Sequence, residues 1–165
     1  MTFEQFEKFT TETPAWLFVF QREVSITEQE RINKKLESFT SNWMSHQVKV
    51  EGEYQWLFNQ AVLVAATTSE GGISGCSKDS LFRVFIELEE EMELFGLPRG
   101  ELHLVKNKKI TSFTRKELLN SLKSGEILAD DMLLNQAISQ VQDILTDNLL
   151  KKIEESSFNR YLVEK

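Results

Sequence analysis

Two continuous apolar runs, at 15–20 and 61–66, constrain the fold more than any other feature of this sequence. A strand is continuously apolar when both faces of its sheet are covered, so each run predicts a strand buried on both faces. Two other segments, 48–54 and 101–104, alternate apolar and polar residues, which is typical of a strand with one solvated face. The four segments therefore predict two inner and two outer strands of one sheet.

Two predicted helices separate these strands. Ser25 and Glu28 form a capping-box pattern that opens the first helix. Its apolar stripe consists of Ile32, Leu36, Phe39 and Trp43. Ser77 is the expected N-cap of the second helix, with Asp79 in its first turn and Gly96 at its end. The order strand, helix, strand, strand, helix, strand predicts an α+β fold, a ferredoxin-like βαββαβ antiparallel sheet.

The chain of 165 residues has the length of one domain, so we expect a single domain over residues 1–165. Residues 14–113 would form the α+β sheet core, with a hairpin turn at 106–108. Residues 114–165 would form a helical extension packed on it, opened by a capping box at Thr114 and Glu117. The two helices of the core cover only one face of the sheet. We expect the extension to cover the other face, with a homodimer as the alternative.

The charge balance limits the partners of the chain. It has 19 Lys and Arg against 26 Asp and Glu, for a net charge of −7. This acidity argues against nucleic-acid binding and against docking on anionic membranes. No apolar stretch reaches the ~18 residues of a membrane span, and residues 1–13 do not resemble a secretory signal. A single Cys favours a reducing compartment, so we expect a soluble cytoplasmic domain, monomeric or homodimeric.

The topology brings two chemically versatile residues to one end of the sheet, since the first helix ends where the second begins. Cys76 would precede the second helix, where amide groups and Lys78 favour a thiolate. His46 would act as its base, and Ser74 with loop amides would hold an oxyanion. The structural alternative is that Cys76 is buried and unreactive. The negative charge of Asp79 would then disfavour the thiolate, and His46 would cap the carbonyl groups at the end of its own helix.

The glycine-rich loop before the second helix has a second interpretation, as an anion-binding site. Its candidate binding residues are Ser74, Gly75, Ser77, Lys78 and Asp79. Trp43, three residues before His46, is a further candidate. The alternative is a tight turn whose helix dipole Asp79 already complements. The chain's two His and one Cys are too scattered for a zinc site, so we expect no metal and no cofactor.

Two further expectations concern exposure. His103 alternates with leucines on an outer strand, so we expect it on the solvated face. Residues 56–58, Trp-Leu-Phe, lie near a hairpin turn, where an exposed apolar patch would indicate a partner surface.

Three segments resemble a known group of proteins. They are the aromatic strand and acidic helix over 16–30, the Trp-x-x-His pattern of Trp43 and His46, and the Ser-Gly-Cys-Ser-Lys-Asp-Ser stretch over 74–80. Together they resemble small uncharacterised bacterial proteins, largely from the Bacteroidetes, some of which are called ABC transporter ATPases. This chain departs from the group at Lys78, usually apolar there, and near Thr68, usually acidic there. The resemblance implies no established activity.

ATP hydrolysis by a protein of that name needs a P-loop, in which a Gly-Lys pair and loop amides hold the phosphates. This chain contains no Gly-Lys pair. The leading hypothesis is therefore a non-enzymatic cytoplasmic binding or adaptor domain for a protein or small molecule. The alternative is a thiol-dependent enzyme or redox-responsive protein that uses Cys76 with His46.

Overall fold

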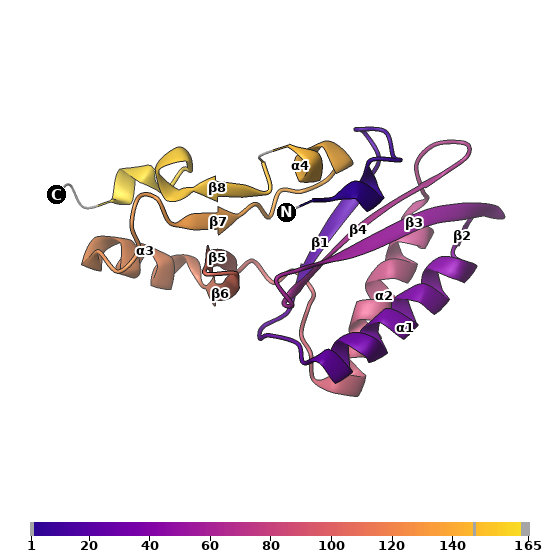
Figure 1. The fold of residues 1–165 in the computed structure, drawn as a ribbon, viewed down its shortest axis with the longest axis horizontal. Helices are drawn as coiled ribbons and strands as arrows, with labels where there is room; N and C mark the ends of the chain where they lie inside the picture. The colour runs from indigo at the N-terminus through magenta and orange to yellow at the C-terminus, as the bar shows by residue number, and fades with distance from the viewer. Residues whose placement is uncertain (1, 147, 163–165) are drawn as a thin grey trace.

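The structure, a computed structural model, describes residues 2–146 and 148–162. These residues form a mixed α and β fold with two four-stranded antiparallel sheets and four α-helices. The two sheets lie side by side along the long axis of the molecule (Figure 1). None of the helices in the described ranges combines the length and the apolar character needed to cross a membrane.

The first sheet has the strand order β1-β4-β3-β2. Its strands are β1 (Ala15–Val19), β2 (Met44–Ser45), β3 (Val48–Leu57) and β4 (Ala61–Thr68). The two apolar runs are adjacent and antiparallel, with Phe18 of β1 opposite Val62 of β4. The prediction that these runs pair with each other is therefore confirmed, but the prediction that 15–20 is an inner strand is wrong, because β1 lies at the edge of the sheet and β3 lies inside it.

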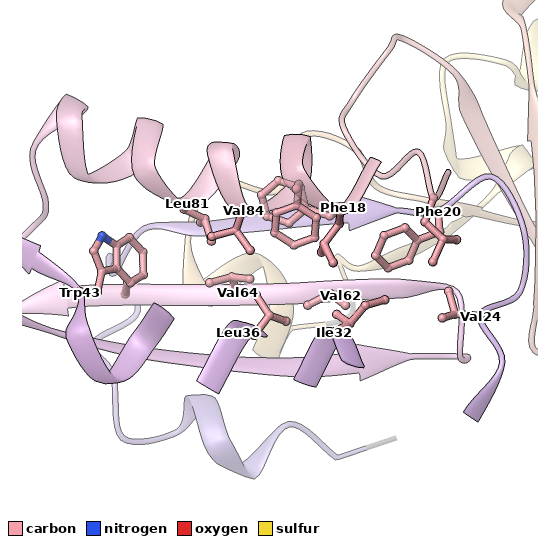
Figure 2. Packing of buried hydrophobic residues seen from close by; sticks show 14 of the residues in the cluster. Phe18, Phe20, Val24, Ile32, Leu36, Trp43, Val62, Val64, Leu81 and Val84 are labelled. Carbon is pink, nitrogen blue, oxygen red and sulfur yellow. The ribbon is translucent and has the colours of Figure 1, made fainter. Parts of the chain in front are cut away.

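Helices α1 (Ile26–Asn42) and α2 (Gly75–Met92) cover one face of this sheet (Figure 1). Side chains from both helices and from β1 and β4 meet between the layers (Figure 2). There the rings of Phe18 and Phe85 stack at 3.6 Å between centroids. The expected capping box at Ser25 and Glu28 is present. α2 ends earlier than Gly96, because Glu93 adopts the left-handed conformation of a helix C-cap.

The expected fourth strand does not join this sheet, so the ferredoxin-like strand order is not present. β5 (Leu102–Lys106) lies instead in a second sheet of order β6-β5-β7-β8. Its partners are β6 (Lys109–Phe113) and β7 (Met132–Leu134), and β8 (Leu150–Lys152) forms the other edge. The expected hairpin turn at 106–108 connects β5 to β6.

The exposure expected for His103 is also wrong, because this residue is buried. β5 has a neighbour on each side, so it is an inner strand of its sheet. Leu104 packs in a cluster with α3 (Arg115–Ser124), whereas Val105 packs in the cluster of the first sheet. Since side chains alternate along a strand, His103 shares the covered face of Val105. Alternation alone does not distinguish a solvated face from a second covered face.

The C-terminal segment is only partly helical. It contains α3, with its predicted capping box, and the short α4 (Val141–Leu145), but also β7, β8 and two short 3-10 turns, η2 (Ile153–Glu155) and η3 (Asn159–Tyr161). The expected helical extension over 114–165 is therefore helical only in part. Short apolar groups such as Leu149 and Leu150 fit a strand as well as a helix, and here Leu150 pairs with β7.

Three segments cover the face of the first sheet that lies away from α1 and α2. They are the N-terminal segment with the 3-10 turn η1 (Glu4–Phe6), the β5–β6 hairpin and the C-terminal segment around α4. The shared apolar cluster includes Phe6, Phe9, Leu63, Ala65, Val105, Ile110, Leu134, Val141 and Ile144. The two sheets are therefore joined by a continuous core.

Candidate functional site

The start of α2 contains most of the residues predicted to bind or react. Ser74, and not Ser77, is the N-cap, since its hydroxyl accepts a hydrogen bond from the Ser77 amide at 3.2 Å. Helix α2 therefore begins at Gly75, and its first turn holds no acidic residue. Asp79 lies beyond this turn and does not complement the helix dipole as expected.

Hydrogen bonds tie β2 to the start of α2. The Ser74 amide donates to the Ser45 hydroxyl at 3.0 Å, and the Ser77 hydroxyl donates to the Met44 carbonyl at 2.9 Å. The indole of Trp43 donates to the Ser77 carbonyl at 3.0 Å. Trp43 is buried at this end of the helix layer (Figure 2). The side chains of Trp43 and Ser77 are therefore engaged within the protein.

His46 and Cys76 lie at the same end of the domain, because their neighbours Ser45 and Ser74 are hydrogen-bonded to each other. Both side chains are exposed. His46 lies in the tight turn between β2 and β3 with φ of +48°, and not in α1. No hydrogen bond connects the imidazole to the thiol within the described residues.

A shallow cavity of about 340 Å³ adjoins this end. Its lining includes Trp16 of β1, Ser74, Gly75 and Lys78. Among the described residues, the amides of Gly75 and Cys76 have no hydrogen-bond partner, as is usual in a first helical turn. Free amides beside a lysine favour an anionic group. No group of three metal-ligating side chains is present in the described part of the chain.

A second candidate site, which the sequence analysis missed, is the outer edge of β3. β2 pairs with β3 only at Val48 and Lys49, and the amide of Val50 donates to the Trp43 carbonyl at 3.0 Å. Main-chain groups of alternate residues point to the same side of a strand. Those of Gly52, Tyr54 and Trp56 therefore point outward, and they have no partner among residues 2–146 and 148–162.

A groove of about 450 Å³ follows this edge. Asn33 and Glu37 of α1 form part of one wall: the Trp56 indole donates to Asn33 Oδ1 at 2.8 Å, and the Tyr54 hydroxyl donates to Glu37 Oε1 at 3.3 Å. Burial, reinforced by the negative charge of Glu37, raises the pKa of Tyr54 to about 12. Glu53, also in the groove, pairs with Lys8. The walls of the groove thus carry acidic side chains.

The apolar patch expected at residues 56–58 is not exposed. Leu57 is fully buried, and Trp56 and Phe58 are half-buried. These side chains pack on the cores of the first sheet.

The sequence contains one signal of the open edge of β3, the difference in length between the long β3 and the few residues available for β2. This signal can be used only when the strand order is known.

Comparisons with models of protein families, with curated proteins and with solved structures found no match for this chain.

Proposed function

We propose that this protein is a non-enzymatic binding or adaptor domain that takes up an extended segment of a partner protein along the outer edge of β3. The observation that carries this proposal is the row of main-chain groups at Gly52, Tyr54 and Trp56 that no described residue pairs with. An added strand would supply the missing hydrogen bonds, and contacts with the groove would select its side chains.

The charge of the groove defines the partner's chemistry. Glu37 on the α1 wall and Glu53 on the opposite face of β3 would flank an added strand. Side chains of the added strand alternate between these two faces. We therefore expect a segment with Lys or Arg on the face toward Glu37, since Glu53 on the other face is already paired with Lys8. A second copy of β3 fits less well, because like charges opposite each other destabilise a strand pair and this edge is rich in glutamate.

The proposal includes a cytoplasmic location, since the exposed thiol of Cys76 suits a reducing compartment. It requires no nucleic acid, metal or cofactor. The proposal also includes membership of the chain in the group of small bacterial proteins, largely from the Bacteroidetes, that its sequence resembles. This membership would not imply an enzymatic activity.

The test is selection of peptides from a random heptapeptide library displayed on phage, followed by measurement of Kd for the selected peptides. We expect sequences enriched in Lys and Arg, and slower hydrogen exchange at the amides of Gly52, Tyr54 and Trp56 when they bind. Tyr54→Pro removes one outward N–H without affecting the hydrogen bonds to β4. Tyr54→Ala loses the same side chain but keeps that N–H.

Relative to Tyr54→Ala, Tyr54→Pro should weaken binding about tenfold, the value of one main-chain hydrogen bond of about 1.4 kcal/mol. Glu37→Lys should also weaken binding, whereas Glu90→Lys, an exposed charge reversal on α2, should not. Circular dichroism would verify that each variant is folded. Equal binding by the proline and alanine variants, or protection at a different set of amides, would exclude this edge as the site.

The second candidate is a thiol-dependent enzyme or redox-responsive protein, favoured by the exposure of Cys76 in the first turn of α2. On this hypothesis iodoacetamide should alkylate Cys76 at neutral pH faster than it alkylates free cysteine, and His46→Asn should slow the reaction. A rate equal to that of free cysteine would eliminate this candidate.

A further inference from the structure

A small cavity of about 180 Å³ lies where the far side of β1 meets the second sheet. Leu17, Val19 and Leu97 contribute apolar side chains to its lining, and Arg99, Glu101 and His103 contribute polar ones. An apolar cavity of about 150 Å³ is large enough to admit benzene. The cavity therefore limits its occupant to a small molecule.

His103 supplies a largely buried polar side chain to the lining of this cavity. The side chain is only 8% exposed, and its Nδ1 lies 2.9 Å from the Ser112 hydroxyl. Nε2 has no hydrogen-bond partner among the described residues. Burial lowers the pKa of His103, so the ring is neutral at pH 7. With the proton assigned to Nδ1, which then donates to Ser112, Nε2 is a free acceptor.

The outer edge of β1 supplies further acceptors. This edge is hydrogen-bonded at two points, from the Ala15 amide to the Ser139 carbonyl at 3.0 Å and from the Gln21 amide to the Phe95 carbonyl at 3.1 Å. Between them, the main-chain groups of Leu17 and Val19 point to the same side. In the part of the chain that the structure describes, these groups have no partner.

The charged side chains around the cavity have a net negative charge. The guanidinium of Arg99 is bonded to Glu89 at 2.7 Å, so these two charges compensate each other. Glu101 forms no ion pair with any described residue. Its carboxylate is therefore the one uncompensated charge among the cavity's charged side chains and their partners, which favours a cation and disfavours an anion.

We propose that this cavity binds a small primary alkylammonium ion. The ammonium group would donate hydrogen bonds to the Glu101 carboxylate, to Nε2 of His103 and to a carbonyl at the β1 edge. A short alkyl chain would lie against Leu17, Val19 and Leu97. Three acceptors match the three N–H donors of a primary ammonium.

The test is an NMR titration of the full chain with n-butylammonium chloride at pH 7.5. We expect saturable shifts of the His103 ring and of the Leu17 and Val19 amides. The equally long n-butanol and butyrate should produce none of them. Bound cation should also lower the pH at which the His103 ring titrates, because a neighbouring positive charge disfavours the imidazolium.

Glu101→Gln should weaken n-butylammonium binding at least fivefold, and Glu126→Gln, an exposed carboxylate after α3, should leave it unchanged. Linear, non-saturating shifts, equal shifts with n-butanol, or full binding by Glu101→Gln would each overturn the proposal. The outcome is independent of peptide binding, because this cavity adjoins β1 and the peptide groove follows β3, at the opposite side of the first sheet.

Discussion

At the scale of single residues, Gln60 has an unusual position. It is buried in the turn between β3 and β4, where its side-chain amide donates to the carbonyls of Phe20 at 3.2 Å and Ile110 at 2.9 Å. Its Oε1 accepts from the Ile110 amide at 3.2 Å. The side chain of Gln60 thus hydrogen-bonds both the amide and the carbonyl of Ile110 in β6. These hydrogen bonds join the two sheets.

Gln60→Leu should lower the free energy of unfolding by about 2–4 kcal/mol, since it leaves several buried main-chain groups without partners. Denaturation with guanidinium chloride measures this loss. Gln142→Leu, in an exposed position, should change stability by no more than about 0.5 kcal/mol. Equal effects of the two substitutions would show that the Gln60 contacts contribute nothing.

At the scale of elements, the start of α1 depends on one carboxylate. Glu28 accepts hydrogen bonds from the Ser25 amide and hydroxyl, both at 2.9 Å, and is paired with Arg22 at 2.7 Å. Hydrogen bonds lower the pKa of Glu28 to about 2. The bond from Arg22 has the largest effect, and the bond from the Ser25 amide has the second largest. A depressed folded-state pKa stabilises the fold above the unfolded-state pKa, and the effect disappears as the pH falls through the folded-state pKa.

Glu28→Ala should therefore destabilise the protein by about 1 kcal/mol at pH 7. The difference from the unsubstituted protein should shrink below about pH 4.5, near the ordinary pKa of a glutamate, and nearly vanish by pH 2. Chemical unfolding at a series of pH values measures both effects. Glu30→Ala, an exposed change on the same helix, serves as the control. A difference that stays constant down to pH 2 would contradict the assigned role of the carboxylate.

At the scale of the whole molecule, the contact between the two sheets buries a titratable ring. Burial lowers the pKa of His103, and the nearby Glu101 only partly offsets this. Arg99, in the same cavity, is compensated by Glu89. The unfolded chain therefore takes up a proton at His103 before the folded chain does, so lowering the pH below about 6.5 destabilises the fold.

The free energy of unfolding should fall on acidification from pH 7 to pH 5, with a contribution from His103 of at most about 1.4 kcal/mol per pH unit. His103→Gln should remove that part of the slope. His46→Asn, which replaces the other histidine at an exposed turn, should leave it intact. Parallel pH profiles for the unsubstituted protein and His103→Gln would contradict this expectation.

The position of the candidate site could be predicted from the sequence better than its local structure. His46 and Cys76 lie at one end of the sheet as predicted, because their position follows from the direction of the helices and strands. The predicted N-cap was wrong, since Ser74 and Ser77 are both acceptable by type and only the backbone shows which hydroxyl reaches the free amide. The β3 groove could not be predicted, because a free strand edge depends on which neighbouring strand is absent.

The sequence alone determined the local features of this protein: the capping boxes at Ser25 and Thr114, the hairpin after Lys106, and the pairing of the two apolar strands. The capping boxes and the hairpin follow from hydrogen bonds between residues a few positions apart. The pairing follows from the two apolar runs, each of which needs cover on both faces. Only the tertiary structure decided that β5 joins the second sheet, that His103 is buried and that most of the outer edge of β3 has no strand partner among the described residues. These depend on which distant segment occupies each strand edge, and residues on an alternating strand fit several such neighbours equally well.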